Sequence, residues 1–136
     1  MTPLNDVARF AQAGNATFTL RSKKTGGRFT YRVRQSEDDA SFFFVQLLTG
    51  PDNTADYAYL GVIRRGVYFH GKKSRITRDA PSNKAFEWFW RMLAASELPL
   101  DQVEVFHCGR CGRCGRPLTV PESVASGFGP DCIGKL

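Results

Sequence analysis

Apolar and polar residues alternate strictly along two neighbouring segments, and this alternation constrains the fold more than any other feature of the chain. In residues 16–22 (ATFTLRS) and 28–34 (RFTYRVR) every second side chain is apolar, and the residues between them, KKTGG, have the composition of a turn. Successive side chains of a β-strand point to opposite faces of a sheet, so each segment predicts a strand with one buried and one solvated face. The two strands and the turn predict an antiparallel hairpin.

Three further segments extend this hairpin into an antiparallel meander of about five strands. Residues 41–50 (SFFFVQLLTG) and 56–63 (DYAYLGVI) are rich in apolar and aromatic side chains, and residues 66–71 (GVYFHG) follow the turn RRG. Near the end of the chain, residues 103–107 (VEVFH) predict one more strand.

Two helices are expected, one before the meander and one after it. The first is short and lies within residues 5–13, because Gly14 follows as a C-terminal stop. In PSNKAFEWFWRMLAAS the apolar period changes to about three and a half, which predicts a helix over residues 82–95 with Ser82 as its N-cap. This helix is apolar nearly all round, so we expect it to pack on the Phe-rich face of the sheet. The predicted fold class is α+β.

Length, charge and composition limit the class of protein. A chain of 136 residues, 42% of them hydrophobic, is enough for one core. No apolar stretch approaches the roughly 18 residues that span a bilayer, and the first residues do not form a secretory signal. We therefore expect no membrane partner and a cytoplasmic location, where thiols stay reduced and a cysteine cluster holds a metal rather than disulfides. The net charge of +6 favours an acidic partner, of which nucleic acid is the commonest.

Cysteine, glycine and arginine repeat with a period of three in residues 107–116 (HCGRCGRCGR). Two cysteines separated by two residues place both sulfurs on one metal ion, and a glycine after the second cysteine can take positive φ, so that backbone N–H groups point at the thiolates. Cys111 and Cys114 with Gly115 fit this turn, and so do Cys108 and Cys111 with Gly112.

The distant ligand is Cys132, which follows GFGPD. We predict one structural zinc held by Cys111, Cys114, Cys132 and His107, with Cys108 as the alternative fourth ligand. An iron–sulfur cluster, a redox dithiol and inert thiols are the other interpretations of the same residues. Thr119 and Glu122 match a capping box around a short helix that Gly127 ends.

The predicted domains are an α+β domain over residues 1–106 and a zinc-binding C-terminal segment, a zinc-knuckle subdomain over residues 107–136, packed on it. Residues 111–132 (CGRCGRPLTVPESVASGFGPDC) are similar to the signature of a family of small, functionally uncharacterised proteins encoded by bacteriophages and some bacteria. That signature reads Cys-x-x-Cys-Gly-Arg-x-Leu-Thr, then Pro-Glu-Ser, then Gly-x-Gly-Pro-x-Cys. RSKKTGGRFTYRVR and FEWFW also resemble the phage members.

The resemblance implies a phage-type accessory protein acting in the cytoplasm of a bacterial host, with Cys111, Cys114 and Cys132 as the matched metal positions. Cys108 lies outside the signature, which favours His107 as the fourth ligand. The family brings no established activity.

Basic residues gather in two windows that contain no acid, 21–34 and 64–78, and in the cysteine run. The residues that we predict to contact nucleic acid are Arg21, Lys23, Lys24, Arg28, Arg32, Arg34, Arg64, Arg65, Lys72, Lys73, Arg110, Arg113 and Arg116. Strand alternation puts Arg28, Arg32 and Arg34 on one sheet face, and it also pairs Tyr57 with Tyr59 and Tyr68 with His70.

Aromatic rings beside a cationic groove are typical of proteins that bind single-stranded DNA or RNA, which is the function we predict. The alternative is a phage effector that binds and inhibits a host protein or defence complex. Plain solvation of the sheet face is the third interpretation.

No enzyme is predicted. The chain has no Gly-rich phosphate loop and no paired carboxylates in a catalytic motif, and its cysteines are assigned to metal. The acidic run at residues 37–39 falls between two predicted strands, where acidic turns are common. We therefore expect no small-molecule substrate.

Overall fold

A computed structural model describes residues 2–3, 6–52, 55–118 and 126–133. It confirms the predicted α+β class, with one antiparallel sheet, a buried helix and a cysteine cluster near the C-terminus. In chain order the elements are β1 (Thr2–Pro3), α1 (Val7–Ala11), β2 (Asn15–Ser22), β3 (Arg28–Gln35), β4 (Phe42–Leu48), β5 (Tyr57–Arg64), β6 (Val67–His70), α2 (Pro81–Ala94), β7 (Val103–His107) and α4 (Pro130–Ile133).

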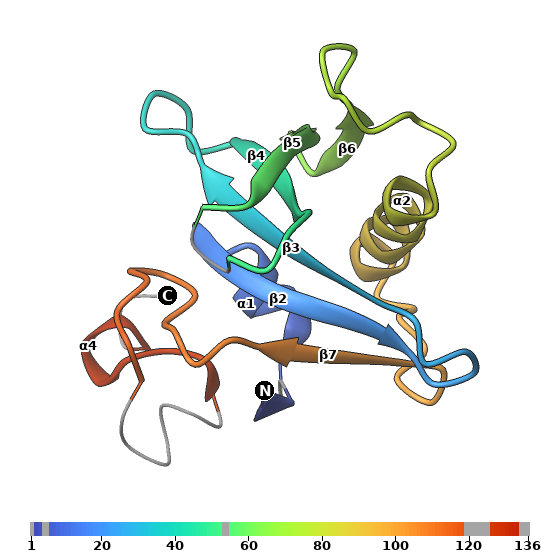
Figure 1. Ribbon diagram of the computed structural model, residues 1–136. Helices are drawn as coiled ribbons and strands as arrows, with labels where there is room; N and C mark the ends of the chain where they lie inside the picture. The colour runs from blue at the N-terminus through green and yellow to red at the C-terminus, as the bar shows by residue number, and fades with distance from the viewer. Residues whose placement is uncertain (1, 4–5, 53–54, 119–125, 134–136) are drawn as a thin grey trace.

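The strands form one seven-stranded antiparallel sheet in the order β1-β7-β2-β3-β4-β5-β6. β2 to β6 are the predicted meander, in which each strand pairs with the next one along the chain. α2 then carries the chain back along one side of the sheet, so that β7 pairs with β2 instead of adding to β6 (Figure 1). The sequence pattern predicted β7 as a strand but not its place, and it did not predict β1.

α2 packs on the apolar face of the sheet through a cluster of aromatic rings. Phe86 lies 4.9 Å from Tyr31 and 4.7 Å from Tyr68, measured between ring centroids. Phe89 lies 5.4 Å from Phe18 of β2. All but Tyr68 of these residues are fully buried, so the predicted apolar helix does cover the Phe-rich face.

The start of α2 differs from the prediction. The helix begins at Pro81, and Ala80 is its N-cap without a side-chain hydrogen bond. Ser82 is therefore not the cap; it lies in the first turn, where its carbonyl oxygen accepts a 2.6 Å hydrogen bond from the hydroxyl of Tyr31. Proline explains the earlier start, because it lacks the N–H that a first turn leaves unpaired and its φ suits a helix.

The first helix is shorter than predicted. α1 spans five residues, with Asp6 as its N-cap: the Asp6 carboxylate accepts a hydrogen bond from the backbone N–H of Arg9. Its Phe10 is fully buried in the same core as the residues of α2. No helix in the described ranges is long and apolar enough to cross a membrane.

Candidate metal centre and open sheet face

Three cysteines from two separate segments converge near the C-terminus. The sulfur atoms of Cys111, Cys114 and Cys132 all lie within 4.8 Å of one another. Around a tetrahedral ion with metal–sulfur bonds of about 2.3 Å, sulfurs lie about 3.8 Å apart, so the cluster is compatible with metal binding. Cys111 and Cys132 are buried and Cys114 is exposed, so the cluster has an inner and an outer side.

The turn around Cys111 has the form that the sequence predicts for a thiolate ligand. The backbone N–H groups of Arg113 and Cys114 donate to the Cys111 sulfur, at 3.4 and 3.5 Å. Gly115 has φ 78° and closes the turn by donating its N–H to the Cys111 carbonyl at 2.9 Å. Only glycine adopts such a φ without strain, which explains the residue at this position.

These donors change the ionisation of the thiols. Burial alone would raise the pKa of Cys111, but backbone N–H groups of Gly129, Cys114 and Arg113 lower it to about 7. The backbone N–H of Arg116 lowers the pKa of Cys114, yet burial and hydrogen bonds with the other two thiols raise it overall. A thiolate is the form that binds metal, so the turn prepares Cys111 as a ligand.

The second predicted turn, Cys108 to Cys111, is not of this kind. Gly112, which would close it, does not have positive φ. It packs instead against Phe10 of α1, where an added Cβ would lie 2.7 Å from the ring carbons. Gly112 also accepts a 2.8 Å hydrogen bond from the N–H of Asn15 in β2, so this glycine joins the cysteine segment to the sheet.

Cys132 reaches the cluster from α4. Its N–H donates to the carbonyl of Gly129 at 3.1 Å, and the neighbouring Phe128 ring lies 5.8 Å from Phe10. The guanidinium of Arg113 donates to the Cys132 sulfur at 3.6 Å, which places a cation beside the thiol. Thr119 and Glu122 of the predicted capping box lie outside the described residues, while Gly127 has φ 80°.

Neither predicted fourth ligand belongs to the clustered group. Among the described residues, the group consists of Cys111, Cys114 and Cys132. His107 is fully buried at the end of β7, with its ring 5.9 Å from Phe10, and its Nδ1 accepts a 2.9 Å hydrogen bond from the N–H of Gly109. His107 as fourth ligand, with Cys108 as the alternative, stays a prediction.

Comparison with known families adds one finding. Residues 103–136 match a family of unknown function, DUF6011. The match covers β7 and the cysteine segment and leaves out α2 and the rest of the sheet. The match places this part of the chain beside a family of unknown function, while the phage origin and the cysteine signature stay predictions. Comparisons with curated proteins and with solved structures gave no match.

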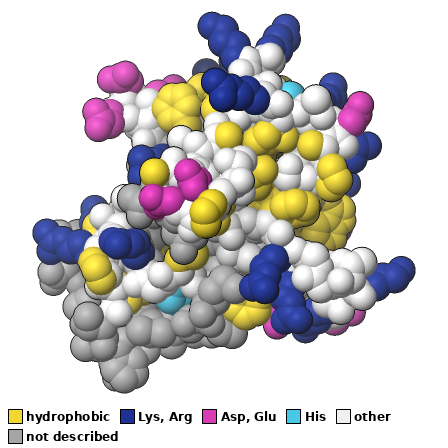
Figure 2. Space-filling view, viewed as in Figure 1, with side chains coloured by type: hydrophobic (Ala, Val, Ile, Leu, Met, Phe, Trp, Pro, Cys, Tyr) yellow, Lys and Arg dark blue, Asp and Glu magenta, His cyan; other side chains and the backbone are white. Residues whose placement is uncertain are grey.

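The predicted basic residues do not share one surface. The sheet face opposite α2 carries, by register, Arg21 of β2, Arg28, Arg32 and Arg34 of β3, and Arg64 of β5. The others lie in the β2–β3 turn (Lys23, Lys24), the β5–β6 turn (Arg65), the loop after β6 (Lys72, Lys73) and the cysteine segment (Arg110, Arg113, Arg116). Figure 2 shows dark blue side chains at the tip that follows β6, at the β2–β3 turn and over the cysteine segment, which lie at different ends of the molecule in Figure 1.

Some of these cations already have local partners. Arg21 pairs with Glu104 of β7 at 3.3 Å, and Arg110 donates to the carbonyl of Gly115 at 3.2 Å. Arg113 donates to Cys132, as described above. The arginine repeat in the cysteine run therefore serves the metal segment itself through at least two of its three members.

Aromatic rings accompany the arginines of the face opposite α2, which we call the open face. Arg32 lies over Tyr57, with 3.7 Å from its guanidinium carbon to the ring centroid, and Arg64 lies 5.0 Å from Phe69 in the same way. Burial and the neighbouring Arg34 lower the pKa of Arg32. Strands β3 to β6 contain no acidic residue.

Tyr57 and Tyr59 lie on the open face as predicted, but Tyr68 and His70 do not. Tyr68 and His70 point to the α2 side, where Tyr68 donates to the Asn83 side chain of the helix and His70 contacts the Ile76 carbonyl in the loop before it. Sequence analysis missed Phe42, Phe44 and Phe69 as members of the open face. In FFFVQLL every residue of the first half is aromatic, so alternation alone does not distinguish the two faces, and only the register with β3 and β5 does.

Proposed function

We propose that this protein binds single-stranded nucleic acid through the open face and that its cysteine cluster holds a structural zinc ion. One observation carries the first part. Strand register places Arg34, Phe44, Val62 and Phe69 in one row across β3 to β6, and the exposed fractions of Phe44 and Phe69 are 43% and 44%.

This row has the two kinds of side chain that bind single-stranded nucleic acid. Phosphates interact with arginine, and the flat faces of bases stack on aromatic rings without regard to sequence. Adjacent strands are about 4.8 Å apart, so side chains of one row lie at successive positions across the sheet. The next row, with Arg32 of β3 and Gln46 of β4, ends at Tyr59, which is 36% exposed. Together the rows offer three exposed rings next to cations.

Soluble proteins do not usually expose large apolar side chains in groups. Of the five large hydrophobic residues that are exposed in the described chain, four lie on the open face: Phe44, Tyr59, Val67 and Phe69. The grouping supports a contact surface over the alternative of a solvated face. The flanking arginines and the lack of acid in β3 to β6 give that surface a positive charge, which supports a polyanion as its partner.

The test is a titration of labelled oligothymidylate, in single-stranded form and as a duplex with oligoadenylate, by fluorescence anisotropy at rising salt. We expect tighter binding to the single strand, and Phe44→Ala or Tyr59→Ala should weaken it by about 1–3 kcal/mol for each stacked base. Leu100→Ala is the control, because Leu100 is also an exposed large hydrophobic residue, at 53%, but lies outside the open face.

Charge is tested in the same assay. Replacing Arg34 by Gln should reduce the slope of log affinity against log salt by about 0.7, the value for one phosphate contact on a single strand. Equal binding of single strand and duplex, or no change in either aromatic variant, would contradict the proposed function.

For the metal, a set of three thiols with backbone N–H donors around Cys111 suits zinc, which prefers tetrahedral sulfur and nitrogen ligands. Cys111, Cys114 and Cys132 would hold it, with His107 or Cys108 as the fourth ligand. A closed site of this kind stabilises the fold and carries out no chemistry. An iron–sulfur cluster is the alternative for the same cysteines.

Elemental analysis of the purified protein should find about one zinc and no iron per chain, in keeping with one four-ligand site. Cys114→Ser is the informative variant: its thiol is exposed, so the change leaves no cavity, and lost stability reports the lost metal. His107→Gln and Cys108→Ser then identify the fourth ligand by which of them lowers the zinc content. Full zinc content in Cys114→Ser would contradict the proposed site.

The context of this activity is also a proposal. The cysteine signature supports a phage-type accessory protein that acts in a bacterial cytoplasm. Its alternative role, an effector that inhibits a host protein, is separated from nucleic-acid binding by a pull-down from nuclease-treated bacterial lysate. A retained stoichiometric protein favours the effector.

A further inference from the structure

A groove of about 770 Å³ runs between β6 and the outer side of α2 and borders the open face at Val67 and Phe69. Every residue of β6 lines it, together with Trp90, Arg91 and Ala94 of the helix. β6 is the last strand of the sheet in the described part of the chain, so the groove borders a strand edge.

The backbone of β6 has hydrogen-bonding groups to offer at this edge. The β5–β6 loop consists of Arg65 and Gly66 with φ 50° and 82°, the two-residue turn that makes Arg64 and Val67 a hydrogen-bonded pair. Hydrogen bonding alternates along an antiparallel ladder, so the N–H and C=O groups of Tyr68 and His70 point away from β5. The N–H of Gly71, which donates to the Leu60 carbonyl at 3.0 Å, fits the same alternation.

The two edges of the sheet differ in how they meet solvent. β1 is two residues long and ends in Pro3, and short strands with proline prevent pairing with another chain. β6, with the sequence VYFH, has neither proline nor a charged residue. An unprotected edge of this kind accepts a further strand.

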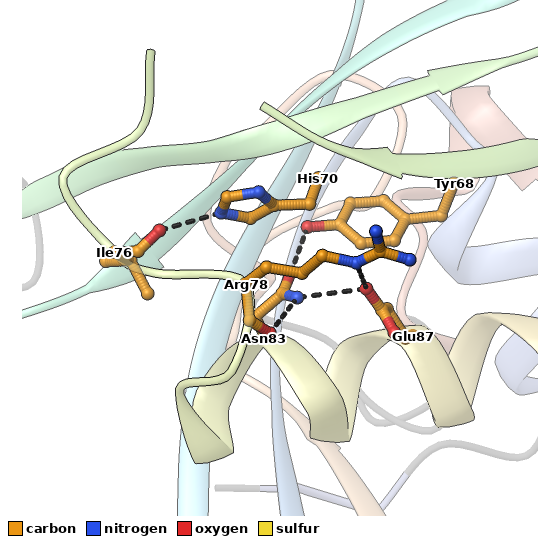
Figure 3. Close-up of polar contacts among 6 residues, drawn as sticks. All are labelled: Tyr68, His70, Ile76, Arg78, Asn83 and Glu87. Carbon is orange, nitrogen blue, oxygen red and sulfur yellow. Dashed lines mark hydrogen bonds and ion pairs between the residues drawn. The ribbon is translucent and has the colours of Figure 1, made fainter. Parts of the chain in front are cut away.

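Hydrogen bonds hold the two walls of the groove in place. Trp90 donates its indole N–H to the Gly66 carbonyl at 2.9 Å, and the Tyr68 hydroxyl donates to the Asn83 side chain at 2.7 Å. Figure 3 shows Tyr68 and His70 pointing from β6 toward the helix, with Asn83 and Glu87 on the helix side. A groove that exists before binding requires little reorganisation when a ligand enters.

The charges along the groove are mostly positive. Lys72, Arg78 and Arg91 line it, against one acid, Glu87. Glu87 is already engaged, since its carboxylate accepts from Asn83 at 3.0 Å and lies 3.8 Å from Arg78. The floor beside these groups is apolar, with the buried Trp90 ring and Ala94.

We propose that this groove binds an extended acidic segment of another protein by strand addition to β6. The main-chain groups of Tyr68 and His70 hydrogen-bond the segment. Its alternate acidic side chains enter the groove and meet Lys72 and Arg91, and the apolar side chains between them lie on the opposite face beside the exposed Val67 and Phe69. Strand addition of this type takes its affinity from the backbone and its specificity from alternate side chains. The site adjoins the open face, with which it shares Val67 and Phe69, but its charged wall lies on the α2 side, and the proposal does not depend on nucleic-acid binding.

The test uses a fluorescein-labelled octapeptide with glutamate and valine at alternate positions. We expect saturable binding by anisotropy, and at least tenfold weaker binding of the peptide with lysine in place of glutamate. Two N-methylated forms are the backbone controls, one methylated at the valines and one at the glutamates. Because only every second N–H of a strand faces its neighbour, one methylated form should lose binding and the other should retain it.

Protein variants locate the site. Ala94→Glu adds a carboxylate to an exposed position in the groove and should lower the affinity for the acidic peptide at least tenfold. Lys84→Gln is the matched control, since it changes the charge by the same amount at an exposed position of the same helix outside the groove. The affinity of both variants for single-stranded oligothymidylate should equal that of the unchanged protein.

Amide hydrogen exchange by NMR distinguishes strand addition from other modes of binding. Peptide should slow exchange at the amides of Tyr68 and His70 at least tenfold. The proposal would be overturned by peptide binding that leaves these two amides unprotected. It would also be overturned if both methylated peptides lost affinity equally, or if no binding were seen at millimolar peptide. A dimer in which these two amides are protected before peptide is added would overturn it too, because a second copy would then occupy the edge.

Discussion

At the scale of single residues, Tyr31 connects the two layers of the fold. Its side chain extends from the middle of β3 and is fully buried, with its ring against Phe86 and Phe18. Its hydroxyl donates to the Ser82 carbonyl in the first turn of α2. Burial, and to a smaller extent Tyr68, raises the pKa of Tyr31 well above its usual range.

This shift predicts a loss of stability in alkali. Below about pH 10 the tyrosine is neutral in both the folded and the unfolded chain, and its stabilising contribution is complete. Above that pH the unfolded chain releases the proton while the folded chain keeps it, so the free energy of unfolding should fall by about 1.4 kcal/mol per pH unit.

Urea unfolding at a series of pH values measures this slope, with Tyr31→Phe as the comparison. The variant lacks the hydroxyl, so at neutral pH it should be less stable by about 1 kcal/mol, the usual contribution of one hydrogen bond. Its stability should depend less on pH above 10 than that of the unchanged protein. Identical alkaline slopes for the two proteins would contradict the assignment.

At the scale of elements, α2 is the helix that closes the core and also forms one wall of the edge groove. Its buried side carries Phe86, Phe89 and Trp90, while Lys84 and Arg91 are exposed. Because the helix is held by rings and not by a side-chain cap, its stability depends on burial.

Phe89→Ala should therefore lower the free energy of unfolding by about 3–5 kcal/mol, as expected for removal of a fully buried aromatic side chain. Trp88→Ala is the matched change on the same helix, and its effect should be smaller because Trp88 is only half-buried. Thermal and urea unfolding monitored by circular dichroism compare the two. A larger loss for Trp88→Ala would show that the helix is oriented differently.

At the scale of the whole molecule, the cysteine segment packs against α1 and the start of β2. The contacts between them include Gly112 against Phe10, Phe128 against Phe10, the hydrogen bond from Asn15 to Gly112 and that from Arg9 to the Ile133 carbonyl. These contacts lie at the α1 end of one continuous core, whereas the rings of α2 pack on Phe18, Tyr31 and Tyr68 elsewhere in that core. The segment contributes Cys111, Phe128 and Cys132 to the buried residues of the protein.

Removal of metal by a chelator should thus disorder one end of the molecule and leave the other intact. Structural zinc contributes about 10–16 kcal/mol to small segments of this type, more than their few apolar contacts supply. In NMR spectra the amides of Gly112, Cys114 and Phe128 should change strongly and those of β5 should not. Readdition of zinc should restore the first spectrum, and unfolding of the whole chain on chelation would contradict this division.

Local patterns account for the parts of the fold and site that the sequence predicted. Alternation defined β2 to β6, the helical period defined α2, and the spacing of Cys111, Cys114 and Gly115 defined a turn that the structure contains with φ 78° at the glycine. Each of these depends on residues close together in the chain, where side-chain direction and backbone conformation follow directly from sequence. The predicted N-cap of α2, Ser82, was wrong by two residues, because Pro81 begins the helix before the serine.

What the sequence alone determined is thus the strands β2 to β7 and the helix α2, the apolar faces of β2, β3 and α2, and the cysteines that converge. Tertiary structure decided the rest. It placed β7 beside β2 and brought Arg34, Phe44 and Phe69 into one row. It also directed the side chains of Tyr68 and His70 toward α2 and formed the groove at the β6 edge. The reason is physical. Strand order, register and edge exposure depend on hydrogen bonds and packing between residues far apart in the chain, and no short pattern encodes them.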